Sequence, residues 1–243
     1  MKILLLGGTG EARSLAAAFA VEPGVHVVSS LAGRITDARL PVGEVRQGGF
    51  GGTEGLAAWM RDNSVDAVVD ATHPFAATMT EHAVEAAREV DVPLLILRRP
   101  GWTSAPGDEW HWADTASEAA GLLPALGSRV FLTIGRQGLS AFARIGVWAL
   151  ARCVEPPEPA PTWCELILDR GPYDVDGELK LMRQHQIDVL VTKDSGGAQT
   201  AAKLIAAREL GVPVVVIRRP PLPAGVETVE SVDRVVEWVK ARR

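Results

Sequence analysis

Three glycines follow the first apolar segment of the chain, and their spacing suits the binding of a pyrophosphate. Gly7, Gly8 and Gly10 come directly after Lys2–Leu6, and Glu11 opens a helical pattern. A pyrophosphate needs a closely approaching backbone and unpaired helix N–H groups, and glycines that follow a buried strand permit both. The pattern departs from a strict GxGxxG, because larger residues take the third glycine position. It indicates a dinucleotide-binding turn, with a plain glycine-rich turn as the alternative.

The second predicted strand indicates which dinucleotide is bound. Strands at this place in NAD-binding domains usually end in Asp or Glu, which accepts hydrogen bonds from the ribose hydroxyls. Here the strand offers Ser29 and Ser30, and Arg34 follows on a short glycine loop. Hydroxyls and a guanidinium suit a 2′-phosphate, which a carboxylate would repel. The sequence therefore favours NADPH, unless Arg34 is an ordinary surface charge.

Two further segments of the first half carry candidate binding residues. Residues 47–53 form a dense glycine loop that can wrap a ligand through Gly49 and Gly51, and Phe50 is expected either on a cofactor ring or in packing. Thr53 is the expected N-cap of the next helix. Residues 70–75 read Asp-Ala-Thr-His-Pro-Phe after the fourth strand, where a doubly wound fold presents side chains to a nicotinamide. Thr72 and His73 are candidates to hold the carboxamide or the substrate.

The second half offers cations instead of a cofactor signature. Lys193 and Ser195, followed by Gly196 and Gly197, form a predicted anion-binding loop, and Arg136 places another cation after an earlier strand. This basic lining suits a substrate that bears carboxylates. The alternative is that Lys193 and Arg136 form salt bridges within their own domain.

An internal repeat organises these motifs into two similar halves. MRDNSVDAVVDATHPFA begins at Met60 and MRQHQIDVLVTKDSGGA at Met182, and matching Arg-Arg-Pro segments end at Pro100 and Pro220. An offset near half the chain length indicates two domains of one fold, and chance likeness of βαβ units is the alternative. Residues 101–114, rich in Gly, Pro and Trp, are expected to cross between the halves.

Apolar strands alternate with helical patterns in both halves, which predicts parallel sheets covered on both faces. The fold class is therefore α/β, with two Rossmann-like doubly wound domains, 1–114 for the cofactor and 115–243 for the substrate, and a cleft between them. Strands are predicted at 2–6, 25–29, 43–46, 66–70, 93–97, 129–133, 147–153, 165–169, 187–192 and 213–217. Helices are predicted at 11–20, 53–62, 76–89, 137–145, 174–185, 198–210 and 231–242.

Composition excludes several classes of function. The 243 residues carry a net charge of −5, which disfavours nucleic acid as a partner, and no apolar run approaches the roughly 20 residues needed to span a membrane. Cys153 and Cys164 have neither disulfide-scaffold nor metal-ligand spacing, so we expect reduced thiols, no metal and a cytoplasmic location. Hydrolase triads, zinc motifs and a P-loop sequence are not found. We expect a monomer or a small homo-oligomer.

Taken in order, these motifs resemble the precorrin-6A reductase family over nearly the whole chain. The most specific is Asp70-Ala-Thr-His-Pro-Phe-Ala76, and the others lie at 7–13, 30–34, 48–52, 132–136, 170–172 and 193–197. The resemblance implies a cobalamin-pathway enzyme that uses NADPH to reduce one double bond of the anionic tetrapyrrole precorrin-6A, giving precorrin-6B. It implies that NADPH is held by Gly8, Thr9, Gly10, Glu11, Ser30 and Arg34, with loop 48–52 closing over it. His73, Arg136, Lys193 and Ser195 would face the macrocycle.

The expected reaction is hydride transfer to an electrophilic carbon of a conjugated imine or iminium system. The proton comes from His73, from Lys193 or with the substrate, and the sequence leaves the three open. Reduction of the cobalt-containing macrocycle is the alternative within the family. A two-domain transferase and an NADP-binding redox sensor without turnover are alternatives outside it.

Overall fold

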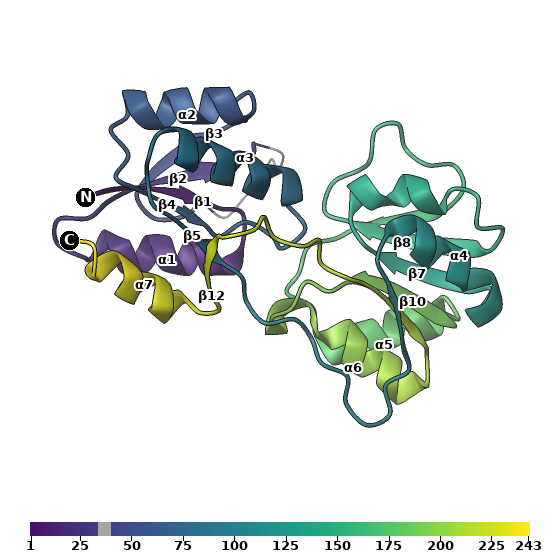
Figure 1. Cartoon of the computed structure of the whole chain (residues 1–243). Helices are drawn as coiled ribbons and strands as arrows, with labels where there is room; N and C mark the ends of the chain where they lie inside the picture. Colours follow the sequence, from purple (N-terminus) through teal and green to yellow (C-terminus); the bar gives the residue numbers. More distant parts are fainter. Residues whose placement is uncertain (34–39) are drawn as a thin grey trace. The chain divides into compact units, whose positions relative to one another are not determined.

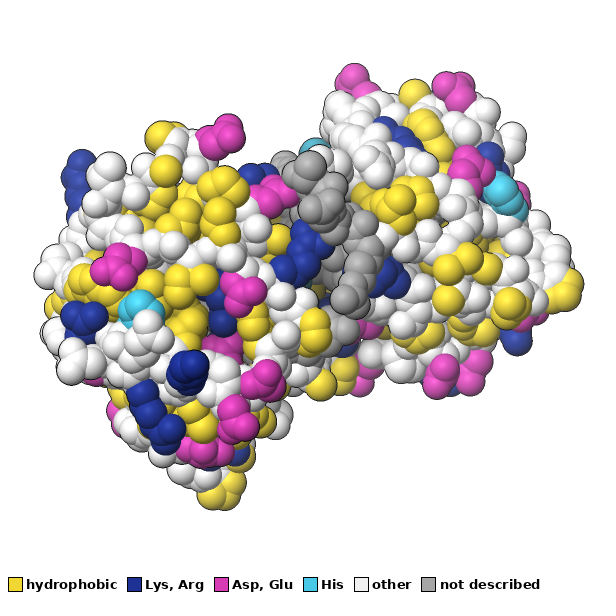
Figure 2. Space-filling model, turned by 180° about the vertical axis from the view of Figure 1, so that it is seen from behind, with side chains coloured by type: hydrophobic (Ala, Val, Ile, Leu, Met, Phe, Trp, Pro, Cys, Tyr) yellow, Lys and Arg dark blue, Asp and Glu magenta, His cyan; other side chains and the backbone are white. Residues whose placement is uncertain are grey.

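The computed structural model describes residues 1–33 and 40–243, which form two compact α/β units. The first unit contains residues 1–100 and 220–243, and the second contains residues 101–219. No helix of the described residues is long and apolar enough to cross a membrane. Side chains of both charge signs are interspersed over the described part of the face shown in Figure 2.

The first unit is built on a six-stranded parallel sheet with the order β3-β2-β1-β4-β5-β12. Its strands are β1 (Lys2–Leu6), β2 (His26–Leu31), β3 (Glu44–Gln47), β4 (Ala67–Asp70), β5 (Leu94–Leu97) and β12 (Glu227–Val229). Its helices are α1 (Gly10–Ala20), α2 (Thr53–Asp62), α3 (Ala77–Glu89) and α7 (Val232–Lys240). The chain reverses direction across the sheet between β1 and β4, where doubly wound folds bind ligands.

Alternating side chains of this sheet bury its two faces under different helices. Ile3 and Leu5 pack with α1 and α7, whereas Leu4 and Leu6 pack with α2 and α3. Figure 1 shows α7 running beside α1, with α2 and α3 on the other side of the sheet. Burial of apolar residues on both faces explains why the strands read as continuous apolar runs.

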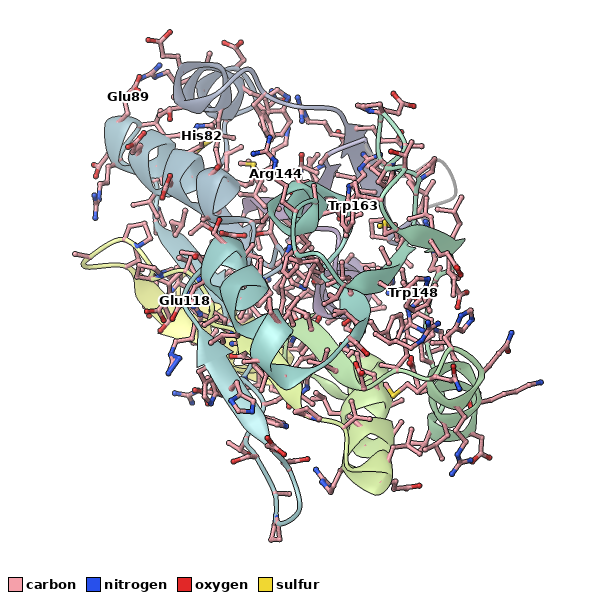
Figure 3. The ribbon with its side chains drawn as sticks, turned by 90° about the vertical axis from the view of Figure 1, so that its right-hand side faces the viewer. His82, Glu89, Glu118, Arg144, Trp148 and Trp163 are labelled. Carbon is pink, nitrogen blue, oxygen red and sulfur yellow. The ribbon has the colours of Figure 1, made fainter. Side chains whose placement is uncertain are left out.

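The second unit repeats this architecture, with the strand order β9-β8-β7-β10-β11-β6, all parallel. Its strands are β6 (Trp110–Ala113), β7 (Arg129–Thr133), β8 (Trp148–Cys153), β9 (Glu165–Leu168), β10 (Val189–Lys193) and β11 (Val214–Ile217). Its α-helices are α4 (Ala116–Leu126), α5 (Val175–Gln184) and α6 (Ala202–Leu210), joined by the 3₁₀ helices η1 (Arg136–Phe142) and η2 (Ala198–Thr200). Trp148, labelled in Figure 3, begins β8 at the amino-terminal edge of this sheet. The Arg129 guanidinium lies 3.8 Å from the centroid of the Trp148 ring, which also stacks on His185.

The two halves exchange their last strand and helix. The chain leaves β5 of the first sheet and forms β6 and α4 of the second unit, where β6 pairs with β11. It then leaves β11 and forms β12 and α7 of the first unit, where β12 pairs with β5. Each sheet is therefore completed by a segment that follows the other half in the sequence.

This exchange corrects the division of the chain expected from the sequence. The expected boundary after residue 114 assigned β6 to the first domain and the final helix to the second, whereas backbone pairing and packing place them the other way round. The 101–114 segment is a crossing that ends in a strand. Strands β6 and β12 are short, and α4 contains Gly121 and Pro124, so none of these elements has a strong local pattern.

Most other predicted elements are confirmed within one or two residues. The helix expected over 137–145 is instead the 3₁₀ helix η1, and the helix expected over 198–210 divides into η2 and α6. Gly138 lies within the first of these segments, where its lack of a side chain weakens a regular helix.

Candidate functional site

The glycine turn joins the carboxyl end of β1 to the N-terminus of α1, where backbone N–H groups have no hydrogen-bond acceptor within the helix. Gly8 has φ +111°, a conformation that favours glycine, and no atom lies within 4 Å of where a Cβ would stand. Thr9 is the N-cap of α1, because its hydroxyl oxygen accepts from the N–H of Ala12 (3.1 Å). The N–H groups of Gly10 and Glu11 open the helix and have no acceptor within it. The turn thus has the backbone geometry for an anionic ligand.

Two of the expected ligand residues in this turn also hold the turn in place. The Thr9 hydroxyl donates to the carbonyl of Ala71 (2.7 Å), which ties the start of α1 to the end of β4. The Glu11 carboxylate pairs with Arg99 at 2.9 Å. The side chains of Thr9 and Glu11 therefore position the turn, and their backbone N–H groups are what they offer to a ligand.

The ends of three neighbouring strands lie level beside this turn. Leu6 is in register with Ser30 of β2 and with Asp70 of β4, and the Ser30 carbonyl accepts from the N–H of Gly7 at 2.9 Å. Ser29 is 1% exposed, and its hydroxyl has no partner among the described residues, so it belongs to the interior. Ser30 is the hydroxyl at the turn, and Arg34 lies outside the described residues.

The glycine loop after β3 is shaped by Arg46, which sequence reasoning missed. Its guanidinium donates to the carbonyls of Gly48 (2.6 Å) and Gly49 (2.7 Å) and to the Ser30 hydroxyl oxygen (3.2 Å). The Phe50 ring lies 3.5 Å from the same guanidinium, so Phe50 packs on Arg46. A lone cation before a run of glycines was the available sequence signal.

The remainder of this loop leads directly into α2. Gly51 and Gly52 have φ of +86° and +91°, which favours glycine at both positions. The prediction that Thr53 caps this helix is wrong, since Gly52 occupies the cap position and the Thr53 hydroxyl donates to Glu85 (2.9 Å). The helix N–H groups at this end consequently have no capping side chain.

Asp70, which is 1% exposed, organises the turn that carries Thr72 and His73. Its Oδ1 accepts from the N–H (3.0 Å) and the hydroxyl (2.7 Å) of Thr72, and its Oδ2 accepts from the Thr80 hydroxyl (2.6 Å). Nδ1 of His73 accepts from the N–H of Phe75 (3.2 Å). This bond assigns the proton of the neutral imidazole to Nε2, which makes Nε2 a donor.

The second unit places its candidate cations at the carboxyl edge of its own sheet. Arg136 follows β7 and pairs with Glu155 at 3.2 Å, which is the salt bridge that the sequence left as an alternative. Lys193 ends β10 in register with Ile217, and burial lowers the pKa of its ammonium group. Ser195 lies in the tight turn that follows, where its N–H donates to the carbonyl of Lys193 (2.6 Å).

Asp194 holds the loop after β10 in place through bonds of its carboxylate to two other segments. Its carboxylate accepts from the N–H of Trp102 (2.9 Å) and pairs with Arg219 (3.1 Å), and the Trp102 indole N–H donates to the carbonyl of Gly197 (3.0 Å). A Cβ on Gly101 would stand 2.6 Å from Asp194 Oδ2, so glycine is required there. In the sequence Asp194 is only a polar loop residue. Its role could not be predicted there, because its partners Trp102 and Arg219 lie about 90 and 25 positions away along the chain.

A buried charged cluster supports the same edge of the second unit and was also missed. Arg152 on β8 pairs with Glu178 on α5 at 2.7 Å, and both residues are less than 9% exposed. Lys203 on α6 donates to the carbonyl of Thr200 (2.7 Å), and burial lowers the pKa of this lysine from 10.5 to about 7. The only signal in the sequence was isolated charges among apolar residues, Arg152 in a strand and Glu178 and Lys203 in helices.

The first unit therefore brings together one set of predicted residues and the second unit another. The set at the carboxyl edge of the first sheet contains Gly8, Thr9, Gly10, Glu11, Ser30, Gly49, Phe50, Gly51, Thr72 and His73. The set at the carboxyl edge of the second sheet contains Arg136, Lys193, Ser195, Gly196 and Gly197. A surface cavity of about 550 Å³ lies at the opposite edge of the first sheet, beside Met1 and Pro93, and contains none of these residues.

Comparisons with known proteins show which family this chain is similar to. A family model described as precorrin-6x reductase CbiJ/CobK matches residues 2–240. A Rhodococcus erythropolis protein named precorrin-6A reductase is 59% identical over 240 residues, covering 98% of this chain and 97% of the relative. A Priestia megaterium protein named cobalt-precorrin-6A reductase is 29% identical over 238 residues, covering 92% of each chain. A solved structure titled CobK precorrin-6A reductase has a TM-score of 0.92 and 40% identity, covering 99% of this chain and 96% of that one.

Proposed function

The chain belongs to the precorrin-6x reductase CbiJ/CobK family, and we propose that it reduces one double bond of the macrocycle precorrin-6A, with NADPH as reductant, in cobalamin biosynthesis. It is accordingly an oxidoreductase. The observation that carries the proposal is the glycine turn, where Gly8 leaves the backbone open at the N-terminus of α1 beside the end of β2. The metal-free macrocycle is the preferred substrate because identity is 59% to a precorrin-6A reductase and 29% to a cobalt-precorrin-6A reductase.

The residues of the first unit fit a dinucleotide phosphate. The open N–H groups of Gly10 and Glu11 point from a helix N-terminus, where the partial positive charge of the helix favours anions. Ser30 offers a hydroxyl and no carboxylate at the end of β2, which suits the 2′-phosphate of NADPH. We assign the cofactor to Gly8, Thr9, Gly10, Glu11, Ser30, Arg34, Gly49, Phe50, Gly51, Thr72 and His73.

NADPH, when bound, supplies a hydride, and the chain must orient both molecules and provide a proton. Nε2–H of His73 is a directed donor, because Nδ1 is held by the N–H of Phe75. The Asp70 hydrogen bonds keep Thr72 and His73 in a single turn at the end of β4. We assign proton delivery to His73 in its imidazolium form, in which Nδ1 holds a proton in place of the bond from Phe75 and Nε2 releases its own, because the neutral ring is too weak an acid. Lys193 is the second candidate, since burial lowers its pKa and makes it a stronger acid.

The cations of the second unit suit the acetate and propionate groups of the macrocycle. Arg136 is 36% exposed at its side chain and keeps donors beyond its pair with Glu155. Gly196 and Gly197, with φ of +65° and +76°, shape a loop whose backbone can approach an anion. We assign substrate binding to Arg136, Lys193, Ser195, Gly196 and Gly197.

The decisive assay mixes the full-length protein, NADPH and precorrin-6A and follows the near-ultraviolet absorbance of NADPH. Oxidation that requires the macrocycle supports the proposal. Oxidation with cobalt-precorrin-6A alone moves the enzyme to the metallated substrate. Tight NADPH binding without turnover of either macrocycle would instead support the redox-sensor alternative.

The role of His73 is tested by the variant His73→Gln, with His82→Gln on α3 as the matched control (Figure 3). Loss of a positioned proton donor should lower kcat by about 100-fold or more. The control should retain full activity, because His82 lies on a helix surface away from the strand ends. Unchanged kcat in His73→Gln would remove His73 from proton delivery, and Lys193→Met would then be expected to lower it.

A further inference from the structure

Arg46 lies one strand beyond Ser30, at the edge of the sheet where the adenosine end of a dinucleotide is expected. The two residues are in register across β2 and β3, and Ser30 is itself in register with Leu6, the residue before the glycine turn. The Arg46 guanidinium reaches back to the Ser30 hydroxyl. The glycine turn, Ser30 and Arg46 thus form a continuous row along the carboxyl edge of the first sheet.

The contacts of Arg46 occupy one edge of its guanidinium and one of its faces. Nη1 donates to Gly48 and Ser30, and Nη2 donates to Gly49, while the Phe50 ring covers one face at 3.5 Å. An arginine has five N–H donors. The described residues provide no acceptor for the N–H of Nε or for the second N–H of Nη2. These two donors form the parallel pair that binds phosphate in a bidentate manner.

The charge of Arg46 is also uncompensated within the described part of the chain. Arg61 pairs with Glu89 at 2.7 Å and Arg99 pairs with Glu11 at 2.9 Å, whereas the described carboxylates include no ion-pair partner for Arg46. Its three acceptors are neutral oxygens, and burial lowers the pKa of this guanidinium. A partly buried cation in this state gains more from an incoming anion than an exposed one does.

We propose that Arg46, together with the Ser30 hydroxyl, recognises the 2′-phosphate of NADPH and sets the preference of the enzyme for NADPH over NADH. The inference rests on the proposed function. A guanidinium only donates hydrogen bonds, so it pairs with a phosphate dianion and cannot accept from the 2′-hydroxyl of NADH. The bonds to Gly48 and Gly49 and the Phe50 ring hold the donor pair in place before the ligand arrives.

The test measures the affinity of the full-length protein for NADPH and for NADH in wild type, Arg46→Met and Arg61→Met. We expect Arg46→Met to weaken NADPH binding by about 10- to 100-fold, the range of one charge-assisted bidentate contact, and to change NADH binding less than about threefold. Arg61→Met should bind both cofactors as wild type does. Equal losses of both cofactors in Arg46→Met would mean that Arg46 only shapes the glycine loop, and an unchanged NADPH affinity would equally overturn the proposal.

A second measurement covers the case in which Arg46→Met does not fold. The wild-type protein is titrated with 2′,5′-ADP and with 5′-ADP while the Nε–H signal of Arg46 is followed by NMR, with Arg46→Lys identifying the signal. We expect a shift with 2′,5′-ADP and none with 5′-ADP, and the reverse would refute the role. If the wild-type protein oxidises NADPH with precorrin-6A while these tests fail, only the role of Arg46 is refuted. If the wild-type protein does not bind NADPH, the proposed cofactor is refuted as well.

Discussion

Trp238 tests the exchange of the terminal elements between the two units. It lies on α7, near the end of the chain, yet it packs in the core of the first unit, 6% exposed, with residues of β1, β4 and β5. Its indole N–H donates to Glu227 (2.7 Å), and the Arg242 guanidinium lies 3.9 Å from its ring centroid. The variant Trp238→Ala should therefore destabilise the amino-terminal unit, although residue 238 follows the whole second half in sequence.

The size of the effect follows from the burial of the side chain. Truncation of a buried Trp to Ala typically costs about 3–5 kcal/mol, because transfer energy is lost and a cavity remains. That is a large part of the roughly 5–15 kcal/mol that stabilises a typical domain. Trp238→Phe keeps most of the apolar burial and loses the bond to Glu227, so it should cost about 1 kcal/mol from that bond plus a smaller cavity term.

Hydrogen exchange by peptide mass spectrometry, beside urea unfolding, identifies the unit that loosens. In Trp238→Ala, peptides that contain β1 (Lys2–Leu6) and β4 (Ala67–Asp70) should lose protection, and those that contain β7 and β10 should keep it. Leu123→Ala on α4, where the side chain is fully buried, is the reciprocal control and should loosen the second unit. Loss of protection confined to β7 and β10 in Trp238→Ala would refute the reasoning.

Two further predictions concern buried polar groups. Because burial lowers the pKa of Lys203 to about 7, the unfolded chain holds a proton that the folded chain has released between about pH 7 and 10.5, and stability should rise with pH there. Urea unfolding of wild type and Lys203→Met at pH values within this window should show a difference that changes by up to about 1.4 kcal/mol per pH unit, and parallel curves would contradict the shift. Thr80→Val removes a donor from the buried Asp70 carboxylate and should lower the free energy of unfolding by about 1.5–3 kcal/mol. The same measurement on Thr53→Val, which loses only an exposed bond to Glu85, should show less than about 1 kcal/mol, and equal losses would argue against a special role for Asp70.

Much of the fold was predictable because its signals are local. A strand such as Lys2–Leu6 is an uninterrupted apolar run, and the helix Thr53–Asp62 carries its buried residues at helical spacing. The repeat of these patterns indicated two similar halves, and the Arg-Arg-Pro segments marked where each half ends. Glycines after an apolar strand likewise predicted the turn at Gly8, whose φ the structure confirms as one that favours glycine.

The tertiary structure alone decided which unit each terminal segment completes. Strand β12 has three residues and β6 has four, so the choice of sheet depends on backbone pairing with β5 or β11 and on the burial of α7 or α4. Either half offers a parallel edge of the same kind. The repeat that makes the two halves recognisable in the sequence thus conceals the exchange between them.

The site divides in the same way between sequence and structure. The order of residues along the chain was enough to single out Gly8, Ser30 and His73, because each lies at the carboxyl end of a strand or just after it. The roles of Arg46 and Asp194 depend on distances to partners in other segments, which no local pattern encodes. The sequence by itself determined the two halves and the chemistry available at their strand ends, and folding decided which donors are held in place there, because burial and hydrogen bonding are set between segments that are far apart in the chain.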